Sequence, residues 1–339
     1  MMPQEEQPAL RLRGLIGGFQ VSQAIHVAAT LGVADLLCNG SRSAFELAAA
    51  LAVDAQALYR LLRTLAAAGV FYEDDQGRFS LTEMGACLCS DAPESLRDQA
   101  VNIGRPADWK VWAYLLESVQ TGQPAFPQLH QGQSIWEWRA THPEENTFFN
   151  RAQYANTRLR THGLLRAYDF GQFPTVADLG GGTGAFLTAL LVHYPGMRGL
   201  LFDQPHVVLE AAPALERAGV AARCTVLGGS FFEAIPPGYA AYILKAVLNS
   251  FDGAARLRML RQVRAVCTAD TRLLVLEDVI GPPNEGLDTK LLDLAMLLRT
   301  GGAQETGEAW AALFASGGFR LARITPSPLG PSVLEGIPV

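Results

Sequence analysis

Helical periodicity dominates the first half of the chain. From Leu10 to about Asp98, apolar residues recur every three or four positions in runs such as VSQAIHVAATLGVADLL and DAQALYRLLRTLAAAGVF, each ending near a glycine. The run that starts at Ser43 predicts a helix, a turn, a second helix and a strand-turn-strand at DDQGRFSLT. This order is typical of a winged helix, and helical periods continue through residues 100–165.

The pattern changes at about Thr175. Short apolar runs follow, separated by helical segments: TVADLG, GLLFD, CTVLGG, YILKAVL and RLLVLEDV. Strands alternating with helices predict an α/β fold, a Rossmann-like doubly wound sheet covered on both faces. We therefore expect an all-α domain with a winged-helix-like part at 1–100, a helical linking segment at 101–172 and the sheet domain at 173–339.

The charge of the chain bears on its partners. Its composition, 49% apolar and 18% charged, suits sizeable cores, and its net charge is −6. The only lysines are Lys110, Lys245 and Lys290, so no polybasic patch is expected and a nucleic-acid partner is disfavoured. The predicted wing is acidic, which favours a winged helix that packs against a partner subunit over one that binds DNA.

Cysteine usage and hydropathy indicate the compartment. The five cysteines show no CxxC or His-paired spacing, so we expect reduced, structural thiols and no metal site. The first residues, MMPQEEQPALRLRG, are polar and unlike a signal peptide, and no run of about 18 apolar residues lacks a charge. A soluble, cytoplasmic protein without membrane association is expected.

The strongest local motif is VADLGGGTGAFLTALL, an apolar strand that leads through glycines into a helix. Glycines such as Gly180 and Gly182 let backbone N–H groups approach a nucleotide-like ligand. NAD, FAD and S-adenosylmethionine all use such a turn, but the GxGxxG spacing is absent and Asp178 precedes the glycines, so NAD fits poorly. Asp203, about twenty residues later, suits ribose hydroxyl groups; capping a helix is the alternative.

Six segments in this order, ADLGGGTG, LLFDQP, LGGSFFEAIP, YILKAVLNSFD, LLVLEDV and TGGAQET, resemble the small-molecule O-methyltransferases of plants and bacteria over essentially the whole chain. The resemblance implies a homodimer, S-adenosylmethionine as cofactor and a small-molecule acceptor. The cofactor-binding residues that it implies are Asp178, Gly180, Gly182, Asp203, Gln204, Ser230, Phe231 and Lys245. Ser230 stands where the family usually has an acidic residue, a loss of about 1–2 kcal/mol in binding.

The catalytic motif departs from the family. Relatives read approximately LKxVLHDWxD, and the histidine is their general base; this chain reads LKAVLNSFDG, with Asn249 at that position. An amide orients an acceptor but removes no proton near neutral pH. Two acidic residues orient the histidine in relatives; the first is Glu277 here, and the second position holds Gln304. Glu305 would substitute for it if the register shifted by one.

Three chemical tasks tolerate the missing base. An acidic phenol needs little base catalysis, an amine or nucleophilic carbon attacks without prior deprotonation, and a divergent enzyme retains the cofactor for a non-methylating step. We favour methyl transfer to an oxygen of a small aromatic or polyketide-like metabolite. The alternative is a non-methylating step or N- or C-methylation by an enzyme of the same fold.

The segment FFNRAQYANTRLRTHGLL is the candidate acceptor wall. Tyr154, Arg158 and His162 fall on one helical face, and Gln153 stands where relatives commonly have methionine. This face would bind an oxygenated aromatic; a solvated helix face is the alternative. His162 is a candidate replacement base. His26, in the first helix, either reaches the partner's site or is buried at the dimer interface.

Overall fold

The computed structural model describes residues 7–339. Residues 1–6, on which the expectation of no signal peptide partly rests, lie outside the described residues. Residue contacts divide the chain into two units, one of residues 1–109 with 147–156 and one of 110–146 with 157–339. The expected linking segment is thus shared between the two units and forms no body of its own.

The first unit contains the predicted winged helix. Its elements are α1 (Pro8–Leu31), α2 (Val33–Leu37), β1 (Arg42–Ser43), α3 (Ala44–Leu51), α4 (Ala55–Ala67), β2 (Phe71–Glu73), β3 (Arg78–Leu81), α5 (Glu83–Ala86), α6 (Arg97–Ile103) and α7 (Pro106–Trp109). Ser43 forms a capping box with Glu46 that starts α3, and the Asp54 side chain caps α4. The predicted strand-turn-strand is the antiparallel pair β2 and β3, and the short strand β1, which was not predicted, pairs with β3 to complete a sheet in the order β1-β3-β2.

The second unit is built on a seven-stranded sheet in the order β6-β5-β4-β7-β8-β10-β9. The first five strands are parallel: β4 (Thr175–Leu179), β5 (Arg198–Asp203), β6 (Cys224–Gly228), β7 (Ala241–Lys245) and β8 (Arg272–Glu277). Two antiparallel strands complete it: β9 (Phe319–Ser327) and β10 (Gly330–Pro338). The Rossmann-like α/β fold is confirmed, and the terminal hairpin is an addition that the sequence analysis did not predict.

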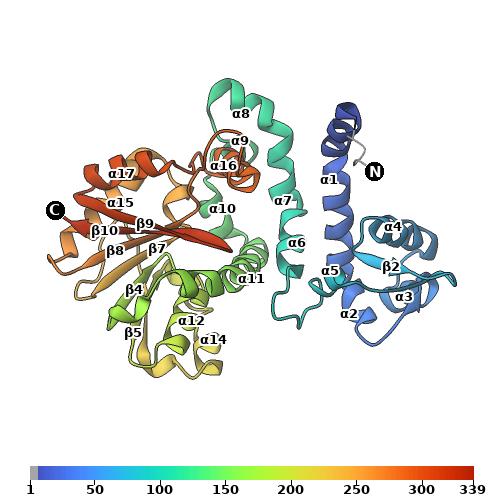
Figure 1. Cartoon of the computed structure of the whole chain (residues 1–339), viewed down its shortest axis with the longest axis horizontal. Coiled ribbons are helices and arrows are strands. Elements are labelled where there is room, and N and C mark those ends of the chain that lie inside the picture. The colour runs from blue at the N-terminus through green and yellow to red at the C-terminus, as the bar shows by residue number, and fades with distance from the viewer. Residues whose placement is uncertain (1–6) are drawn as a thin grey trace, which may run out of the picture. The chain divides into compact units, whose positions relative to one another are not determined.

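Helices cover both faces of this sheet. The helices that follow β4 in the chain are α12 (Ala185–His193), α13 (Pro205–Val208), α14 (Ala212–Arg217), η3 (Ala221–Arg223), η4 (Leu248–Ser250), α15 (Gly253–Val266), α16 (Leu287–Arg299) and α17 (Gly307–Ser316); of these, α16 packs against α8 and α9. The preceding helices are η1 (Lys110–Tyr114), α8 (Leu115–Thr121), α9 (Ala125–Leu129), α10 (Ile135–Thr141), α11 (Pro143–Ala167) and η2 (Phe170–Gln172). Helices α12 and α14 lie on one face, and α15 and α17 on the other (Figure 1).

Alternation along the strands explains the two covered faces. Val176 and Ile243 belong to the buried cluster with α12, whereas their neighbours Ala177 and Tyr242 belong to the cluster with α15 and α17. Successive strand residues point to opposite faces, so both faces are apolar and both need helices. Each fully buried large apolar side chain contributes about 1.5–3 kcal/mol.

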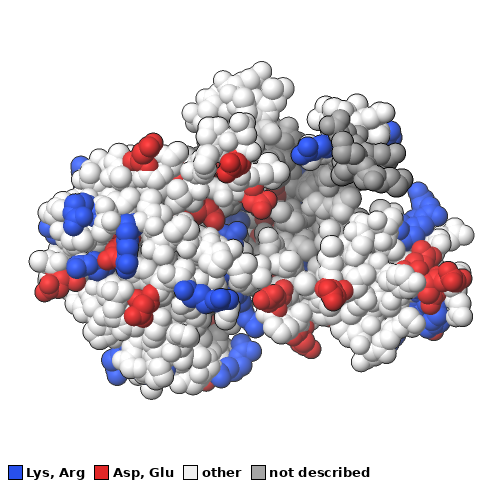
Figure 2. Space-filling view, viewed as in Figure 1, with Lys and Arg blue, Asp and Glu red and all other residues white. Residues whose placement is uncertain are grey.

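Two surface properties complete the description. On the face drawn in Figure 2, Lys and Arg side chains are scattered among uncharged residues and form no continuous patch. Over residues 7–339, no helix combines the length and the hydropathy that crossing a membrane requires.

Candidate active site

The candidate site lies at the carboxyl ends of the parallel strands. Strand β4 leads to β5 and β6 on one side, and the chain then returns to place β7 on the other side of β4. Ligands of doubly wound sheets bind at such a switch point, outside the carboxyl ends of the strands. The predicted residues follow these ends: Gly180 after β4, Asp203 at the end of β5, Ser230 after β6, Lys245 at the end of β7 and Glu277 at the end of β8.

The glycine turn after β4 has the backbone conformation that a ligand cradle requires. Gly180 and Gly182 have φ values of +70° and +61°, a region that favours glycine. A Cβ atom on Gly180 would lie 2.7 Å from Val247 Cγ2, so a side chain there would close the turn. The Gly182 N–H donates to Asp203 Oδ2 at 2.8 Å, which ties the turn to β5. The sequence-predicted pair of glycine turn and carboxylate is therefore in contact.

The charged part of the site consists of Asp178, which is buried, and Lys245, which is half-buried. Asp178 is 1% exposed, and its carboxylate oxygens make no hydrogen bond to a described residue. Burial raises the pKa of Asp178 to about 7, against the opposing charge of Lys245. Burial likewise lowers the pKa of Lys245, whose Nζ donates to Thr157 Oγ1 at 2.9 Å. A buried carboxylate without a hydrogen-bond donor is a place where a ligand donor is needed.

Three further predicted cofactor residues line the same end of the sheet. Gln204 precedes α13, and its N–H donates to Asp203 Oδ1 at 2.7 Å, while its side chain is exposed. The Ser230 hydroxyl accepts from Phe232 N at 3.2 Å. Phe231 is half-buried and approaches the glycine turn, since a Cβ on Gly180 would lie 3.6 Å from its ring. The glycine cradle, the buried carboxylate and the flat apolar ring together fit a nucleoside-bearing cofactor with an amino-acid end.

The predicted catalytic residues lie together beyond β7 and β8. Asn249, in η4, is 4% exposed, and its backbone N–H donates to Glu277 Oε1 at 3.2 Å. Burial raises the pKa of Glu277 to about 8, although the Asn249 N–H opposes this. Gln304 is 2% exposed, and its side-chain amide has no hydrogen-bond partner among the described residues. Its backbone N–H donates to Asp293 Oδ1 at 2.8 Å, which fixes the segment against α16.

Arg256, a residue that sequence reasoning missed, joins these segments. It is 3% exposed, and its Nε donates to the carbonyl oxygens of Leu248 at 2.8 Å and Phe251 at 2.7 Å, on either side of Asn249. Its other nitrogens reach the Ala303 carbonyl and, at 2.8 Å, the Glu305 carboxylate. Glu305 therefore forms an ion pair with Arg256. Of the two neighbours Gln304 and Glu305, Gln304 is the one whose side chain is buried. The helix-interior position of Arg256 gave no sequence signal beyond an arginine in an amphipathic run.

Gly302 brings the same two segments into close contact. A Cβ at this position would lie 1.9 Å from the Asn249 carbonyl oxygen, a distance that no side chain can occupy. The backbone of the GGAQET segment thus packs directly on η4. The glycine of this motif has a packing role that its sequence context did not indicate.

Helix α11 contacts the sheet of the second unit through residues that the sequence analysis did not choose. In the part of α11 that belongs to the second unit, Arg158 and His162 are exposed, whereas Thr157 and Thr161, on the adjacent side of the helix, are buried. Thr157 receives the Lys245 hydrogen bond, and Arg160 pairs with Asp278 at 2.8 Å just after β8. Thr157 therefore lies on the side of α11 that contacts β7, and the roles of Arg158 and His162 toward an acceptor stay predictions.

Three predicted residues lie in the first unit. Gln153 is exposed and Tyr154 is half-buried in the part of α11 that belongs there. The His26 Nδ1 lies 3.1 Å from the Ala100 carbonyl oxygen, and the ring packs where a Cβ on Gly104 would clash with it. His26 thus contacts α6 of its own subunit. The roles of Gln153 and Tyr154 toward an acceptor stay predictions.

Two family models match the chain, one for each of its main parts. A family model for an O-methyltransferase domain matches residues 112–320, and one for an O-methyltransferase dimerisation domain matches residues 14–91. The chain belongs to the O-methyltransferase family. It is thus a methyltransferase of an S-adenosylmethionine-dependent family, as the sequence motifs predicted.

Curated relatives of this methyltransferase act in bacterial secondary metabolism. It is 40% identical to the phenazine O-methyltransferase of Lysobacter antibioticus, over 96% of this chain and 95% of the relative. Identity to the mitomycin 6-O-methyltransferase of Streptomyces lavendulae is 37%, over 94% and 90%. The 8-amino-8-demethylriboflavin N,N-dimethyltransferase of Streptomyces davaonensis is 34% identical, over 95% and 93%. The relatives therefore include enzymes that methylate oxygen and one that methylates nitrogen.

Solved structures agree with this assignment. The crystal structure of LaPhzM matches with a TM-score of 0.93 and 40% identity, covering 98% of this methyltransferase and 99% of that chain. NcsB1, an O-methyltransferase from neocarzinostatin biosynthesis, was solved with S-adenosyl-L-homocysteine and 1,4-dihydroxy-2-naphthoic acid. It matches with a TM-score of 0.79 and 32% identity, over 94% and 96% of the two chains.

Proposed function

We propose that this methyltransferase transfers a methyl group from S-adenosylmethionine to an oxygen of a small, fused aromatic or polyketide-like metabolite, without a histidine base. The observation that carries the proposal is the buried pair of amides, Asn249 and Gln304, beside the raised-pKa carboxyl of Glu277. The names of the relatives support the acceptor class, since they include a phenazine, a mitomycin and, in NcsB1, a naphthoic acid.

The cofactor supplies an electrophilic methyl group on a sulfonium when it is bound. Residues of this chain do the remaining work. Asp178 and the glycine turn hold the cofactor end of the site, and Asp203 offers a carboxylate for the ribose. The Gln304 amide, buried and without a partner among the described residues, is available to an acceptor oxygen, and leaving it unpaired would cost about 1–3 kcal/mol.

Proton removal limits which acceptors react. Glu277 holds its proton near neutral pH because burial raises its pKa to about 8, and its oxygen receives the Asn249 backbone N–H. No ionised base therefore faces the acceptor from these three residues at pH 7. General-base assistance contributes about 10²–10⁴-fold, so a hydroxyl group already acidified by its ring system is the acceptor that tolerates the loss. Hydroxyl groups conjugated with a carbonyl or a ring nitrogen have this property.

Nitrogen methylation is the second candidate. An amine attacks through its lone pair and loses its proton afterwards, so an amide at position 249 is no handicap. The N,N-dimethyltransferase relative at 34% identity gives this candidate specific support. The two candidates differ in the pH dependence of the rate, because a phenol becomes reactive as pH rises through its own pKa and an aromatic amine is already neutral.

We also propose that the protein acts as a homodimer. The first unit matches a dimerisation domain, and α1 exposes a run of large apolar side chains. They are Leu10, Leu12, Leu15, Ile16, Phe19, Val21 and Val27. A monomer with this helix in water would be unfavourable, and a second copy of the chain is the occupant that the domain match indicates.

The Asn249→His substitution tests the proposed chemistry. S-adenosylhomocysteine formation is measured at pH 7 with a series of hydroxylated fused aromatics whose hydroxyl pKa values differ. We expect the wild-type rate to rise steeply with acceptor acidity and the histidine variant to gain about 10-fold or more on the least acidic members. Asn249→Ala, which removes the amide without supplying a base, is the matched control and should lose rate on all acceptors.

Three outcomes would contradict the proposal. A wild-type rate independent of acceptor acidity would mean that a base acts elsewhere in the site. If only aromatic amines were turned over, the enzyme would be a nitrogen methyltransferase and not an oxygen methyltransferase. Cofactor that stays bound and unconsumed over both series would indicate a non-methylating step.

A further inference from the structure

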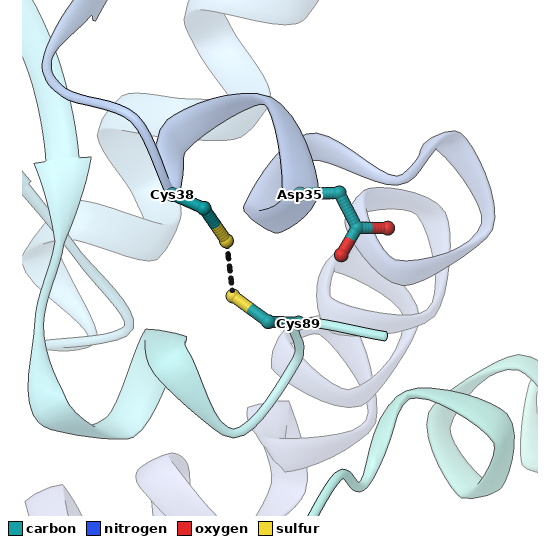
Figure 3. A group of neighbouring side chains, drawn as sticks. All are labelled: Asp35, Cys38 and Cys89. Carbon is teal, nitrogen blue, oxygen red and sulfur yellow. Dashed lines mark hydrogen bonds between the residues drawn. The ribbon is translucent and has the colours of Figure 1, made fainter. Parts of the chain in front are cut away.

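Two thiols meet in the first unit, far from each other in sequence. Cys38 follows the last residue of α2 and Cys89 lies three residues after α5, and their Sγ atoms are 3.0 Å apart (Figure 3). Both thiols also point toward the Ala34 carbonyl oxygen, at 3.4 Å and 3.7 Å. The contact joins parts of the chain separated by 51 positions, and all five cysteines are free.

The two thiols have different surroundings. Cys38 is exposed and Cys89 is 8% exposed. Burial, together with the neighbouring Cys38 thiol, raises the pKa of Cys89 to about 12, so this thiol stays protonated. An oxidant from solvent therefore meets Cys38 first, and Cys89 is held behind it within reach. This arrangement matches a thiol that is oxidised and a second thiol that resolves the product.

A metal site is the other reading of this cluster. Asp35 brings a carboxylate within 4.8 Å of both sulfur atoms. That carboxylate already accepts the Ser90 N–H and hydroxyl, each at 2.7 Å, and pairs with Arg97 at 3.4 Å. A dication would lie beside the Arg97 guanidinium and would need a thiolate from the buried Cys89, both of which oppose binding. Disulfide formation places no dication beside Arg97, and it needs the Cys89 thiolate only at the moment of attack, not as a permanent ligand.

We propose that Cys38 and Cys89 form an oxidation-sensitive dithiol that closes to a disulfide under peroxide and fastens α2 to the segment after α5. Peroxide oxidises the Cys38 thiol to a sulfenic acid and releases one water. The Cys89 sulfur then attacks the Cys38 sulfur, the S–S bond forms, and the hydroxyl group leaves with the Cys89 proton as a second water. One peroxide is reduced and two thiols are oxidised.

The position of the bond indicates its effect. Both cysteines lie within residues 14–91, the stretch that matches the dimerisation domain. The bond would close a long loop and restrict the unfolded chain, which raises the thermal midpoint of this unit by about 5–10 °C. Neither cysteine is one of the candidate active-site residues of the second unit, so the proposal concerns the stability of the first unit and not the methyl-transfer step.

The test uses the full-length reduced protein treated with hydrogen peroxide. We expect the count of titratable thiols under denaturing conditions to fall from five to three. The intact mass should fall by two hydrogen atoms, and peptide mapping should find the Cys38–Cys89 link. Thioredoxin or dithiothreitol should reverse all three changes. Cys87→Ser is the matched control, because Cys87 is two positions from Cys89 and donates instead to the Glu83 carbonyl oxygen at 3.6 Å; it should oxidise like wild type.

Two variants keep the proposal open to refutation. Cys38→Ser, at an exposed position, should fold normally and lose the link, and Cys89→Ala should leave a Cys38 sulfenic acid that dimedone traps. A linked peptide that contains Cys87, or an unchanged thiol loss in Cys38→Ser, would overturn the assignment. So would zinc or cadmium bound stoichiometrically to the reduced protein and lost in Cys38→Ser, because the cluster would then be a metal site.

Discussion

Buried ionisable side chains give the site its properties at the scale of single residues. Asp178 and Glu277 are each 1% exposed, near the carboxyl ends of β4 and β8, which β7 separates in the sheet, and burial raises the pKa of both. A protein keeps such groups buried at a cost in stability, which a bound ligand offsets. The cofactor-free protein therefore carries a pH dependence that reports on its site.

We expect Asp178→Asn to stabilise the cofactor-free protein more at pH 8 than at pH 5. The folded pKa of Asp178 is about 7 and its unfolded value is 3.8. Between these values the folded state keeps a proton that the unfolded state releases, so wild-type stability falls as pH rises through this window. Asparagine has no such penalty. The change in the free energy of unfolding that Asp178→Asn causes, measured by urea unfolding, should be about 2–4 kcal/mol more favourable at pH 8 than at pH 5.

Lys245 changes the stability of the protein in the opposite direction at higher pH. Its pKa is lowered in the folded state, so the unfolded state binds more protons and stability rises with pH. The comparison of wild type with the variant therefore carries the result, and Asp270→Asn, at an exposed carboxylate, is the control with no expected difference. Equal effects of Asp178→Asn at both pH values would mean that the carboxyl is not buried in the folded protein.

Residues that lie in sequence motifs could be predicted, and residues inside helices could not. The positions of Asn249, Gln304 and Glu277 could be predicted because each lies in or just after a strand or glycine motif that fixes its register, and their catalytic roles stay predictions. The contact of Thr157 could not be predicted, because nothing in an amphipathic helix indicates that one of its threonines accepts a hydrogen bond from Lys245 Nζ. Helical spacing identifies a face, but not which face turns toward the sheet.

At the scale of elements, Arg256 of α15 fastens η4 to the segment before α17. Three backbone carbonyls and one carboxylate share its guanidinium. Because η4 carries Asn249 and the other segment carries Gln304, this arginine sets the relative position of the two amides. It acts on the site through the backbone and touches neither amide.

We expect Arg256→Met to lower stability by about 3 kcal/mol, because Glu305 loses its partner and buried carbonyls lose their donor. The turnover number should fall by at least 10-fold while the Kd of S-adenosylmethionine changes little. Arg258→Met is the matched control: Arg258 lies two residues along the same helix, is exposed, and contacts only Phe232 among the described residues, through a hydrogen bond to its carbonyl oxygen and a guanidinium over its ring. Cofactor binding lost in parallel with turnover would contradict a role confined to the amides.

The elements themselves were predicted unevenly. Strands β4, β5, β7 and β8 were found because each is a short apolar run that is almost entirely buried, and the exposed edge strand β6 was found because its sequence, CTVLG, is still a short apolar run. Strand β9 was missed because it lies at the edge of the sheet, where residues such as Arg320, Arg323 and Thr325 break the apolar run. Edge strands need no continuous apolar sequence, so hydropathy alone gives little indication of them.

At the scale of the whole molecule, the proposed dimer has a direct test. Leu15 and Ile16 of α1 are 69% and 68% exposed in one chain. Replacing both by aspartate places two charges on the apolar surface, and we expect light scattering after gel filtration to show a shift from dimer to monomer.

Leu209→Asp is the matched control, because Leu209 is 79% exposed but lies in the second unit, outside the dimerisation domain match. It should leave the mass in solution unchanged. A Leu15→Asp, Ile16→Asp protein that remains dimeric would place the subunit contact elsewhere.

The close approach at Gly302 has a consequence for how such an enzyme changes over time. Where one backbone rests on another with no room for a side chain, the frame of the site does not depend on the groups that it displays. Residues 249 and 304 project from that frame and are exchangeable by single codon changes, whereas position 302 is not. A lineage built this way can gain or lose a proton acceptor without rebuilding its scaffold, which makes new acceptor chemistry accessible in few steps to selection or to an engineer.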